Sequence, residues 1–144
     1  MVIWMSEDRV LTYRKTVTEA DVGLFAGVTG DFSPIHVDAQ YAAEQPIKER
    51  LAHGVLILGL MSAAAARWCE REGVDALSYG YERVRFIRPV RLGETVTVSY
   101  RFLREESETG KIFAAVEAHR QDGTLVGATE HILWRMGSEH EVAG

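Results

Sequence analysis

The chain has 144 residues, a length that suits one domain with a single hydrophobic core. Hydrophobic residues make up 47% of it and charged residues 26%, a balance typical of soluble proteins. The net charge of −5 argues against a general nucleic-acid binder, and the single cysteine, Cys69, excludes an internal disulfide and fits the cytoplasm. We expect one domain over residues 1–144, with frayed ends at about 1–8 and 137–144.

The sequence predicts no signal peptide and no membrane partner. The first residues carry Glu7, Asp8 and Arg9 in place of a long apolar run. The longest apolar stretch, residues 54–66, is shorter than the roughly 18 residues that suggest a membrane span. A buried core helix is the better interpretation of that stretch.

A strand and a helix are predicted at the start of the chain. Residues 10–17, VLTYRKTV, have the composition of a strand that leads into a turn. Thr18 can cap a helix over about residues 19–28, and Asp21 supplies an acidic side chain to its first turn. We expect this helix to end near Gly30, because glycine readily adopts the conformation that closes a helix.

A proline separates this helix from the next one. Pro34 lacks an amide proton and biases the residue before it away from helix. Residues 31–36 are therefore predicted to form a bent, non-helical loop. Asp38 can cap a second short helix that runs to about Ala43, and Pro46 ends that helix or opens a loop.

The most informative segment is residues 54–73, GVLILGLMSAAAARWCEREG. Its first part, residues 54–66, is apolar or small on every side of a helix, and such a helix must be covered all round. Charged residues from Arg67 onward bring the helix end to the surface, and Gly73 can terminate it. The helix would be about 28 Å long.

Strands dominate the rest of the chain. In residues 94–103 apolar and polar side chains alternate, which places Val96, Val98, Tyr100 and Phe102 on one face. The four predicted strands cover residues 79–88, 94–103, 111–119 and 124–134.

Together these elements predict an α+β protein with a hot-dog fold, in which an antiparallel sheet wraps around the long central helix. We expect the sheet to bury that helix, because the chain has too little other helical sequence to cover it with a second layer of helices. Two such sheets joined in a homodimer would shield much of the side that one sheet leaves open. A homodimer is therefore expected on physical grounds.

Asp31 and His36 are the candidate acid–base pair. They would diverge on a helix, but around a proline-bent loop they can converge on one point. A carboxylate and an imidazole that face one water molecule suit hydration, because one accepts a proton from the water and the other delivers a proton to the substrate. Aspartate near glycine and proline is also common in turns, so a structural loop is the alternative.

The start of the apolar helix, at His53 and Gly54, is the second candidate. Amide protons of a first helical turn lack internal partners, the dipole adds positive potential, and glycine permits close approach to the backbone. The Gly54 amide could hold a carbonyl and stabilise an enolate oxyanion. Alternatively, Gly54 only permits tight helix–sheet packing, and His53 either closes the loop or lines the site.

Two stretches of the chain carry a family resemblance. Residues 29–43, TGDFSPIHVDAQYAA, match the motif Gly-Asp-x-Asn-Pro-hydrophobic-His except for Ser33, and residues 52–62, AHGVLILGLMS, contain a downstream His-Gly pair. In these stretches the chain resembles the MaoC-like hydratases, most closely the (R)-specific enoyl-CoA hydratases of the hydratase 2 group. Residues 83–98 look like the family's strand–turn–strand, and the resemblance covers about residues 10–134.

The resemblance implies a lyase of fatty acid metabolism that reversibly hydrates a trans-2-enoyl thioester to the (R)-3-hydroxyacyl thioester. Asp31 and His36 would be its catalytic pair, and the Gly54 amide would hold the thioester carbonyl. Coenzyme A or an acyl-carrier arm would be part of the substrate, and no separate cofactor is expected. Ser33 offers one hydroxyl where the family has an amide, but it can still brace the loop by a local hydrogen bond.

Weaker candidates accompany this site. Ser62, about two turns after Gly54, either supports the site or bonds to its own helix. Four basic residues could bind the phosphates of coenzyme A: Lys48, Arg50, Arg85 and Arg88. For Arg85 and Arg88, a strand face exposed to solvent is at least as good an explanation. Arg83 is expected on the same strand face as Arg85.

No metal site is expected, because Asp31, His36 and Asp38 form no familiar ligand spacing. His119 and His131 fall on predicted strands and are expected at the surface or in cross-strand pairs. Two other functions stay open: a hot-dog acyl-CoA thioesterase and a non-catalytic acyl-thioester binding module. The first stays open because one fold hosts several reactions, and the second because of Ser33 and the chain's small size.

Overall fold

The computed structural model describes residues 10–137, which form one antiparallel sheet and four helices. Of the ends predicted to fray, 1–8 and 137–144, all residues except Gly137 lie outside the described part of the chain. The elements follow in the order β1 (Leu11–Thr16), α1 (Glu19–Thr29), α2 (Pro34–Val37), α3 (Ala39–Glu44), α4 (Gly54–Glu72), β2 (Ala76–Phe86), β3 (Thr95–Glu106), β4 (Lys111–Arg120) and β5 (Leu125–Arg135).

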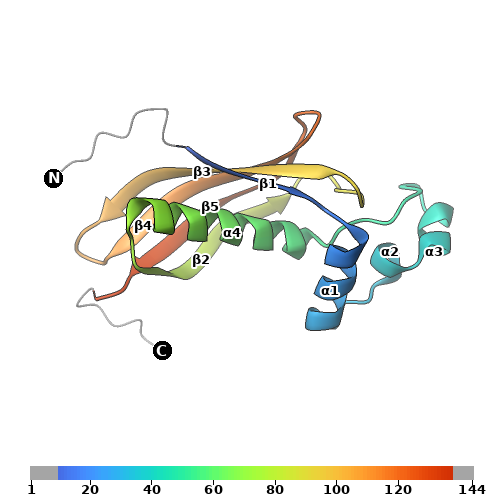
Figure 1. Cartoon of the computed structure of the whole chain (residues 1–144), viewed down its shortest axis with the longest axis horizontal. Helices are drawn as coiled ribbons and strands as arrows, with labels where there is room; N and C mark the ends of the chain where they lie inside the picture. Colours follow the sequence, from blue (N-terminus) through green and yellow to red (C-terminus); the bar gives the residue numbers. More distant parts are fainter. Residues whose placement is uncertain (1–9, 138–144) are drawn as a thin grey trace.

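The sheet has the strand order β1-β3-β4-β5-β2, and every neighbouring pair is antiparallel. The long helix α4 lies along one face of this sheet, and α1, α2 and α3 gather beyond the N-terminal end of α4 (Figure 1). The predicted α+β hot-dog architecture is confirmed. Among the described helices, none is both long enough and apolar enough to cross a membrane.

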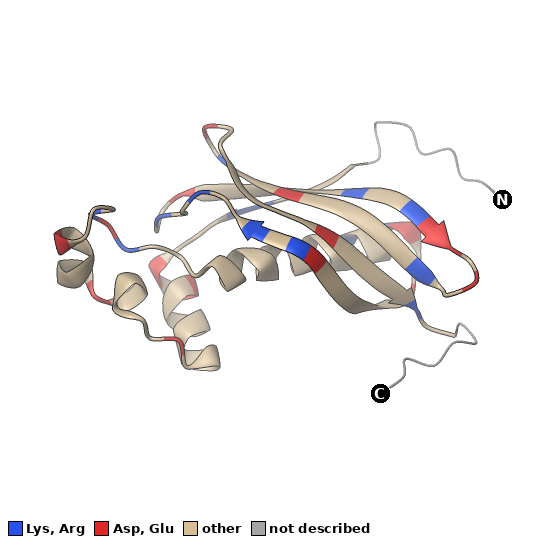
Figure 2. Cartoon of the chain, turned by 180° about the vertical axis from the view of Figure 1, so that it is seen from behind, with Lys and Arg blue, Asp and Glu red and all other residues tan. Residues whose placement is uncertain are grey.

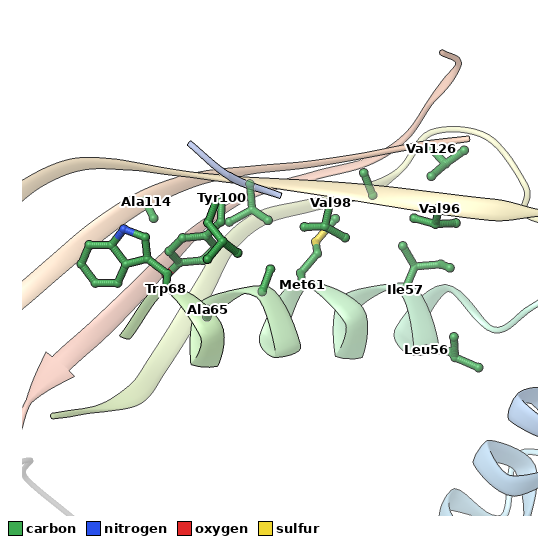
Figure 3. Packing of buried hydrophobic residues seen from close by; sticks show 14 of the residues in the cluster. Leu56, Ile57, Met61, Ala65, Trp68, Val96, Val98, Tyr100, Ala114 and Val126 are labelled. Atoms are coloured by element: carbon green, nitrogen blue, oxygen red, sulfur yellow. The ribbon is translucent and has the colours of Figure 1, made fainter. Parts of the chain in front are cut away.

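The hydrophobic core forms between α4 and the sheet. Figure 3 shows Met61 and Trp68 of α4 packed toward Val98 and Tyr100 of β3. The predicted alternation along β3 is the reason, since it turns these apolar side chains toward the helix, where both are fully buried. Complete burial of a side chain of this size stabilises the fold by roughly 1.5–3 kcal/mol.

One side of α4 stays open in the single chain. Val55 is 56% exposed, and Gly59, Ser62 and Ala66, which follow at helical spacing, are also exposed. On the side that faces the sheet, Met61 is only 1% exposed. The sheet thus covers the helix on one side and leaves uncovered the side for which a second copy is expected.

The local signals at the helix ends are confirmed. Asp21 N donates to Thr18 Oγ1 at 3.2 Å and Thr18 N donates to Asp21 Oδ2 at 2.8 Å, which makes a capping box at the start of α1. Gly30, at φ 82°, closes α1, and Gly73, at φ 66°, closes α4. Asp38 caps α3 with its side chain, as predicted.

The prediction that residues 31–36 are wholly non-helical is wrong. Pro34–Val37 forms one helical turn, α2, with the proline at its start. At that position a helix needs no amide proton and the fixed φ of proline favours the helical conformation. Ser33, before the proline, keeps an extended ψ of 133°, so the chain bends there as expected.

Strand β2 departs most from its predicted bounds. It begins at Ala76, three residues earlier than predicted, and two register shifts interrupt its pairing with β5. The second shift lies between Glu82 and Arg85, and Arg83 within it has a φ of 51°. The regular alternation that was expected to place Arg83 and Arg85 on one face is therefore broken by a bulge.

His131 is buried and not at the surface. It is 1% exposed, and its imidazole lies 2.8 Å from Ser78 Oγ through Nε2 and 2.7 Å from Tyr100 Oη through Nδ1. Burial lowers the pKa of His131 to about 4, so the imidazole is neutral at neutral pH. The cross-strand part of the prediction holds for His131, and His119 is half-buried beside Glu117.

Candidate active site

Three chemically active side chains meet where the α1–α2 connection approaches the start of α4. Asp31, His36 and His53 each place one side-chain nitrogen or oxygen within 4.8 Å of those of the other two. Asp31 is exposed, His36 is half-buried and His53 is 2% exposed. The group is therefore buried at His53 and open to solvent at the Asp31 carboxylate.

The Asp31 carboxylate is held by its own loop. Gly30 turns the chain after α1, and Asp31 N donates to Thr29 Oγ1 at 3.1 Å. Asp31 Oδ1 then accepts two hydrogen bonds from Ser33, from Oγ at 2.8 Å and from the backbone N at 3.2 Å. The hydroxyl of Ser33, followed by its amide, lowers the pKa of Asp31 below its usual value.

His36 is fixed by a backbone carbonyl on the far side of the site. Its Nδ1 lies 2.7 Å from Leu51 O, and because a carbonyl only accepts, Nδ1 must carry the proton. In the neutral ring Nε2 is therefore the bare nitrogen. Arg50 braces the same turn, since its Nε donates to His36 O at 2.8 Å and its Nη1 to Glu19 at 2.7 Å.

His53 both closes the loop and lines the site, the two roles that the sequence left open. Its Nε2 donates to the backbone carbonyl of Asp31 at 2.9 Å, and this hydrogen bond holds Asp31 next to the start of α4. Its ring stacks on His36, with centroids 3.8 Å apart and planes at 25°, and packs against Phe25 at 4.7 Å. Nδ1 of His53 is buried without a hydrogen-bond partner in the described part of the chain.

Gly54 opens α4 directly after His53. A Cβ at this position would lie 2.6 Å from Cδ2 of Phe86, closer than real side chains come. The packing role proposed for this glycine is therefore supported by the contact with β2. The first amide protons of α4 have no acceptor within the helix, as in any helix, which leaves the carbonyl-binding role open as a prediction.

The structure does not gather every predicted residue at this point. Ser62 lies exposed on α4 and its hydroxyl makes no hydrogen bond to any described residue. The exposed guanidinium groups of Arg85 and Arg88 donate to carbonyls of the preceding residues, and basic positions gather near the C-terminal end of β2 (Figure 2). Lys48 and Arg50 line a separate hollow of about 280 Å³.

An apolar groove of about 270 Å³ lies beside the site, between α1 and α4. Phe25 lines this groove and also packs on His53, so the groove and the site share a wall. The other lining residues are Lys15, Asp21, Leu24, Val28, Leu56 and Leu60. Lys15 and Asp21 form an ion pair at 2.6 Å, so their charges offset each other.

Sequence reasoning missed the residues that fix the two imidazoles. The Leu51 carbonyl, the Phe25 ring and the brace from Arg50 to His36 all depend on contacts between residues 14 or more positions apart. Leucine and phenylalanine carry no chemical signal for such a role. Arg50 was a candidate phosphate ligand because of its charge, but in the structure its guanidinium donates to His36 O of α2 and to the Glu19 carboxylate.

Comparisons with known proteins agree with this architecture. An (R)-specific enoyl-CoA hydratase from Rhodospirillum rubrum is 37% identical over 95 residues, which cover 66% of this chain and 64% of that protein. The unliganded R-hydratase PhaJ1 from Pseudomonas aeruginosa superposes with a TM-score of 0.77 and 34% identity, over 88% of this chain and 79% of that one. A Probable Thioesterase from Bartonella henselae shares the fold at 12% identity, with a TM-score of 0.61 and coverage of 92% and 94%.

The chain spans slightly less than two thirds of the Rhodospirillum rubrum protein. A family model described as "MaoC like domain" matches residues 5–121, well over half of the chain. The matched residues include α1, α2 and the start of α4, where Asp31, His36 and His53 meet. The chain belongs to the MaoC-like domain family.

Proposed function

We propose that this protein reversibly hydrates a trans-2-enoyl thioester to the (R)-3-hydroxyacyl thioester. The observation that carries the proposal is that the Asp31 carboxylate, whose pKa is lowered, lies close to the His36 imidazole, whose Nε2 carries no proton, beside the start of α4. The names of the two hydratases described above, to which the chain is similar, support the same reaction.

In this proposal Asp31 and His36 hold one water molecule and move two protons. One of the pair accepts a proton from the water as its oxygen adds to the β-carbon, and the other delivers a proton to the α-carbon. The two side chains lie within 4.8 Å of each other, so the two proton transfers are assigned to the pair and not to one residue each. Ser33 keeps the carboxylate oriented and ionised through its two hydrogen bonds.

The start of α4 would stabilise the enolate that forms between the two proton transfers. The Gly54 amide donates to the thioester carbonyl, and the absence of a side chain permits the close approach. Loss of one such donor typically costs on the order of 3 kcal/mol in the transition state.

The rest of the substrate would be an apolar acyl chain and a phosphate-bearing handle. The groove lined by Phe25, Leu56 and Leu60 offers apolar surface next to the site. Lys48, Arg85 and Arg88 remain candidates for the phosphates of coenzyme A or of an acyl-carrier arm, which makes a separate cofactor unnecessary.

A homodimer is part of the proposal. The open side of α4 carries small and apolar residues, and the first half of β2, the edge strand among the described residues, carries Leu77 and Tyr79, which are 54% and 49% exposed. An unpaired edge strand with exposed apolar side chains is a natural pairing surface. A second copy that joins its sheet at β2 would cover both surfaces at once.

The test is enoyl-CoA hydration followed by the loss of the conjugated double bond's absorbance, across short, medium and branched acyl chains. We expect turnover by the unaltered chain, and a loss of roughly 10²- to 10⁴-fold in Asp31→Asn and in His36→Ala. Matched controls are Asp122→Asn, in the exposed β4–β5 turn, and His119→Ala, and both should keep normal rates.

Three results would contradict the proposal. Normal rates in both site variants would remove the roles assigned to Asp31 and His36. Thiol release without hydration would indicate an acyl-CoA thioesterase. Binding of an enoyl or hydroxyacyl thioester without turnover of any chain length would indicate a binding module.

A further inference from the structure

We propose that Thr129 is a positioning residue for the Gly54 amide, and that it acts through a bulge in β2 and the ring of Phe86. The structural part of the proposal, the placement of the start of α4, stands on contacts among β2, β5 and α4 alone. Only the effect on the reaction rests on the proposed function, in which the Gly54 amide holds the thioester carbonyl.

Strand β2 has one residue more than β5 at the point where the two strands shift register. Two residues of β2, Arg83 and Val84, lie opposite the single β5 residue Thr129, which is the definition of a β-bulge. Arg83 has a φ of 51°, a conformation that a residue with a Cβ rarely adopts. Contacts elsewhere in the structure must therefore hold the bulge in place.

The hydroxyl of Thr129 supplies such a contact. Thr129 is 8% exposed, and its Oγ1 donates to Glu82 O at 2.8 Å, directly before the two bulged residues. The same oxygen lies 3.3 Å from Glu130 O, but a hydroxyl has a single proton and the shorter contact is the better bond. Because a bulge interrupts the backbone ladder, the side-chain donor stabilises the carbonyl at the interruption.

The bulge decides which side chains of β2 share a face of the sheet. Residues directly opposite each other in an antiparallel pair lie on the same face, and side chains alternate along each strand. Tyr81 pairs with His131, and Phe86 pairs with Gly127, four positions earlier on β5. Tyr81 and Phe86 therefore share one face although they are five positions apart, which regular alternation forbids and the extra residue of the bulge permits.

That face is the one that α4 covers. A Cβ at Gly127 would lie 3.1 Å from Cε of Met61, and Figure 3 shows Met61 pointing from α4 toward the sheet. Without the extra residue, Arg85 would pair with Gly127 and turn its charged side chain toward α4. Phe86 would then point to the outer face of the sheet. The bulge thus gives the start of α4 an apolar ring to pack against.

The ring of Phe86 fixes the position of Gly54. Three of its carbons would lie 2.6–2.9 Å from a Cβ at Gly54, so the ring and the helix backbone are in direct contact. A ring that moved away would leave the first turn of α4 without this support. Displacement of a reacting group by 1 Å can cost about 100-fold in rate, so Thr129 affects the reaction although it touches no substrate.

NMR spectroscopy tests the placement without any activity, through the amide and α-proton signals of Gly54. The ring current of Phe86 shifts these signals, and Phe86→Ala shows where they fall without the ring. Thr129→Val keeps the size of the side chain and loses the donor, so we expect it to move the Gly54 signals toward their positions in Phe86→Ala. Thr129→Ser keeps the hydroxyl and should leave them close to those of the unaltered chain.

Steady-state kinetics of enoyl-CoA hydration test the effect on the reaction. We expect kcat to fall about 10- to 100-fold in Thr129→Val and in Phe86→Ala, at a KM within about twofold, because the amide acts mainly in the transition state. The double variant should lose no more than Phe86→Ala alone, since Thr129 acts through that ring. Thr129→Ser should keep most of kcat. Thr97→Val, which removes from β3 a hydroxyl that bonds to no described residue, is the matched control and should keep normal rates.

The outcomes separate this proposal from the proposed function. Gly54 signals that stay in place in a folded Thr129→Val chain overturn it, whether or not the protein hydrates enoyl thioesters. Displaced signals at a normal kcat, or losses that add in the double variant, overturn the effect on the reaction. If Thr129→Val does not fold, a normal kcat in Phe86→Ala overturns the proposal. An unaltered chain without hydratase activity contradicts the proposed function, and the NMR signals then still decide the placement.

Discussion

Ser33 shows how a single residue can depart from a family motif and keep its local task. The motif has an amide side chain at this position, whereas Ser33 offers only a hydroxyl. That hydroxyl donates to Asp31 Oδ1 at 2.8 Å and leaves the cap of α2 without a side-chain bond. The Ser33 side chain therefore orients the Asp31 carboxylate and does not cap the helix that follows it.

Removal of this hydroxyl should slow the reaction without unfolding the protein. In Ser33→Ala one of the two bonds to Oδ1 is lost, and a bond to a charged group contributes about 1.5 kcal/mol or more. We expect kcat/KM for enoyl-CoA hydration to fall about tenfold, mainly in kcat, at an unchanged unfolding temperature. Steady-state kinetics measure this, with Ser33→Asn as the conservative control that should retain more activity. Equal kinetics in the unaltered chain and Ser33→Ala would show that the backbone bond alone suffices.

At the scale of elements, the start of α4 is defined by its contact with β2. Gly54 faces the ring of Phe86, which is 48% exposed and stands at the end of the strand. The helix that carries the candidate oxyanion donor is thus held against the sheet at a position where no side chain fits between them. Packing against Phe86 and the proposed approach of a carbonyl to the backbone both require a glycine at position 54.

Gly54→Ala should destabilise the fold although alanine is the better helix former. The added Cβ would lie 2.6 Å from Cδ2 of Phe86, and such overpacking costs about 1–3 kcal/mol. Chemical denaturation measures the loss, and Phe86→Leu in the same chain should restore most of it. The control is Gly23→Ala in α1, where an added Cβ meets nothing within 4 Å and should stabilise by up to about 1 kcal/mol. A Gly54→Ala variant as stable as the unaltered chain would mean that the half-exposed ring swings aside.

For the whole molecule, the open face of α4 is the surface on which the proposed homodimer depends. Small and apolar residues, among them Gly59 and Ala66, form an exposed stripe on the helix side away from the sheet. Small side chains let two helices approach closely, and β2 has an unpaired edge on the same molecule. Both features fit a symmetric pair of chains.

Ala66→Arg should separate that pair. A long charged side chain in the middle of an apolar interface cannot be paired or solvated, so the variant is expected to run at the mass of one chain, 16.1 kDa. Light scattering after size exclusion measures the mass, which should be twice this value for the unaltered chain. Ala43→Arg, an exposed position on α3, is the matched control and should leave the dimer intact. A monomeric unaltered chain would contradict the proposed assembly.

Much of the element order could be read from short stretches of sequence. The ends of α1 follow from Thr18, Asp21 and Gly30, and the core face of β3 follows from its alternation. Such signals act between residues a few positions apart, through backbone conformation and local hydrogen bonds. One of the local errors, the α2 turn, arose because a proline both bends the chain before it and starts a helix after it.

The sequence by itself thus determined the helices other than α2, the strands, the hot-dog arrangement and the candidate pair Asp31 and His36. Only the tertiary structure decided that His53 stacks on His36, that Leu51 sets the tautomer of His36, and that His131 is buried. The reason is physical: the free energy of those contacts depends on closing the chain between residues 15 or more positions apart. The pattern of residues near one another in the sequence does not indicate which distant side chains will contact them in the folded chain.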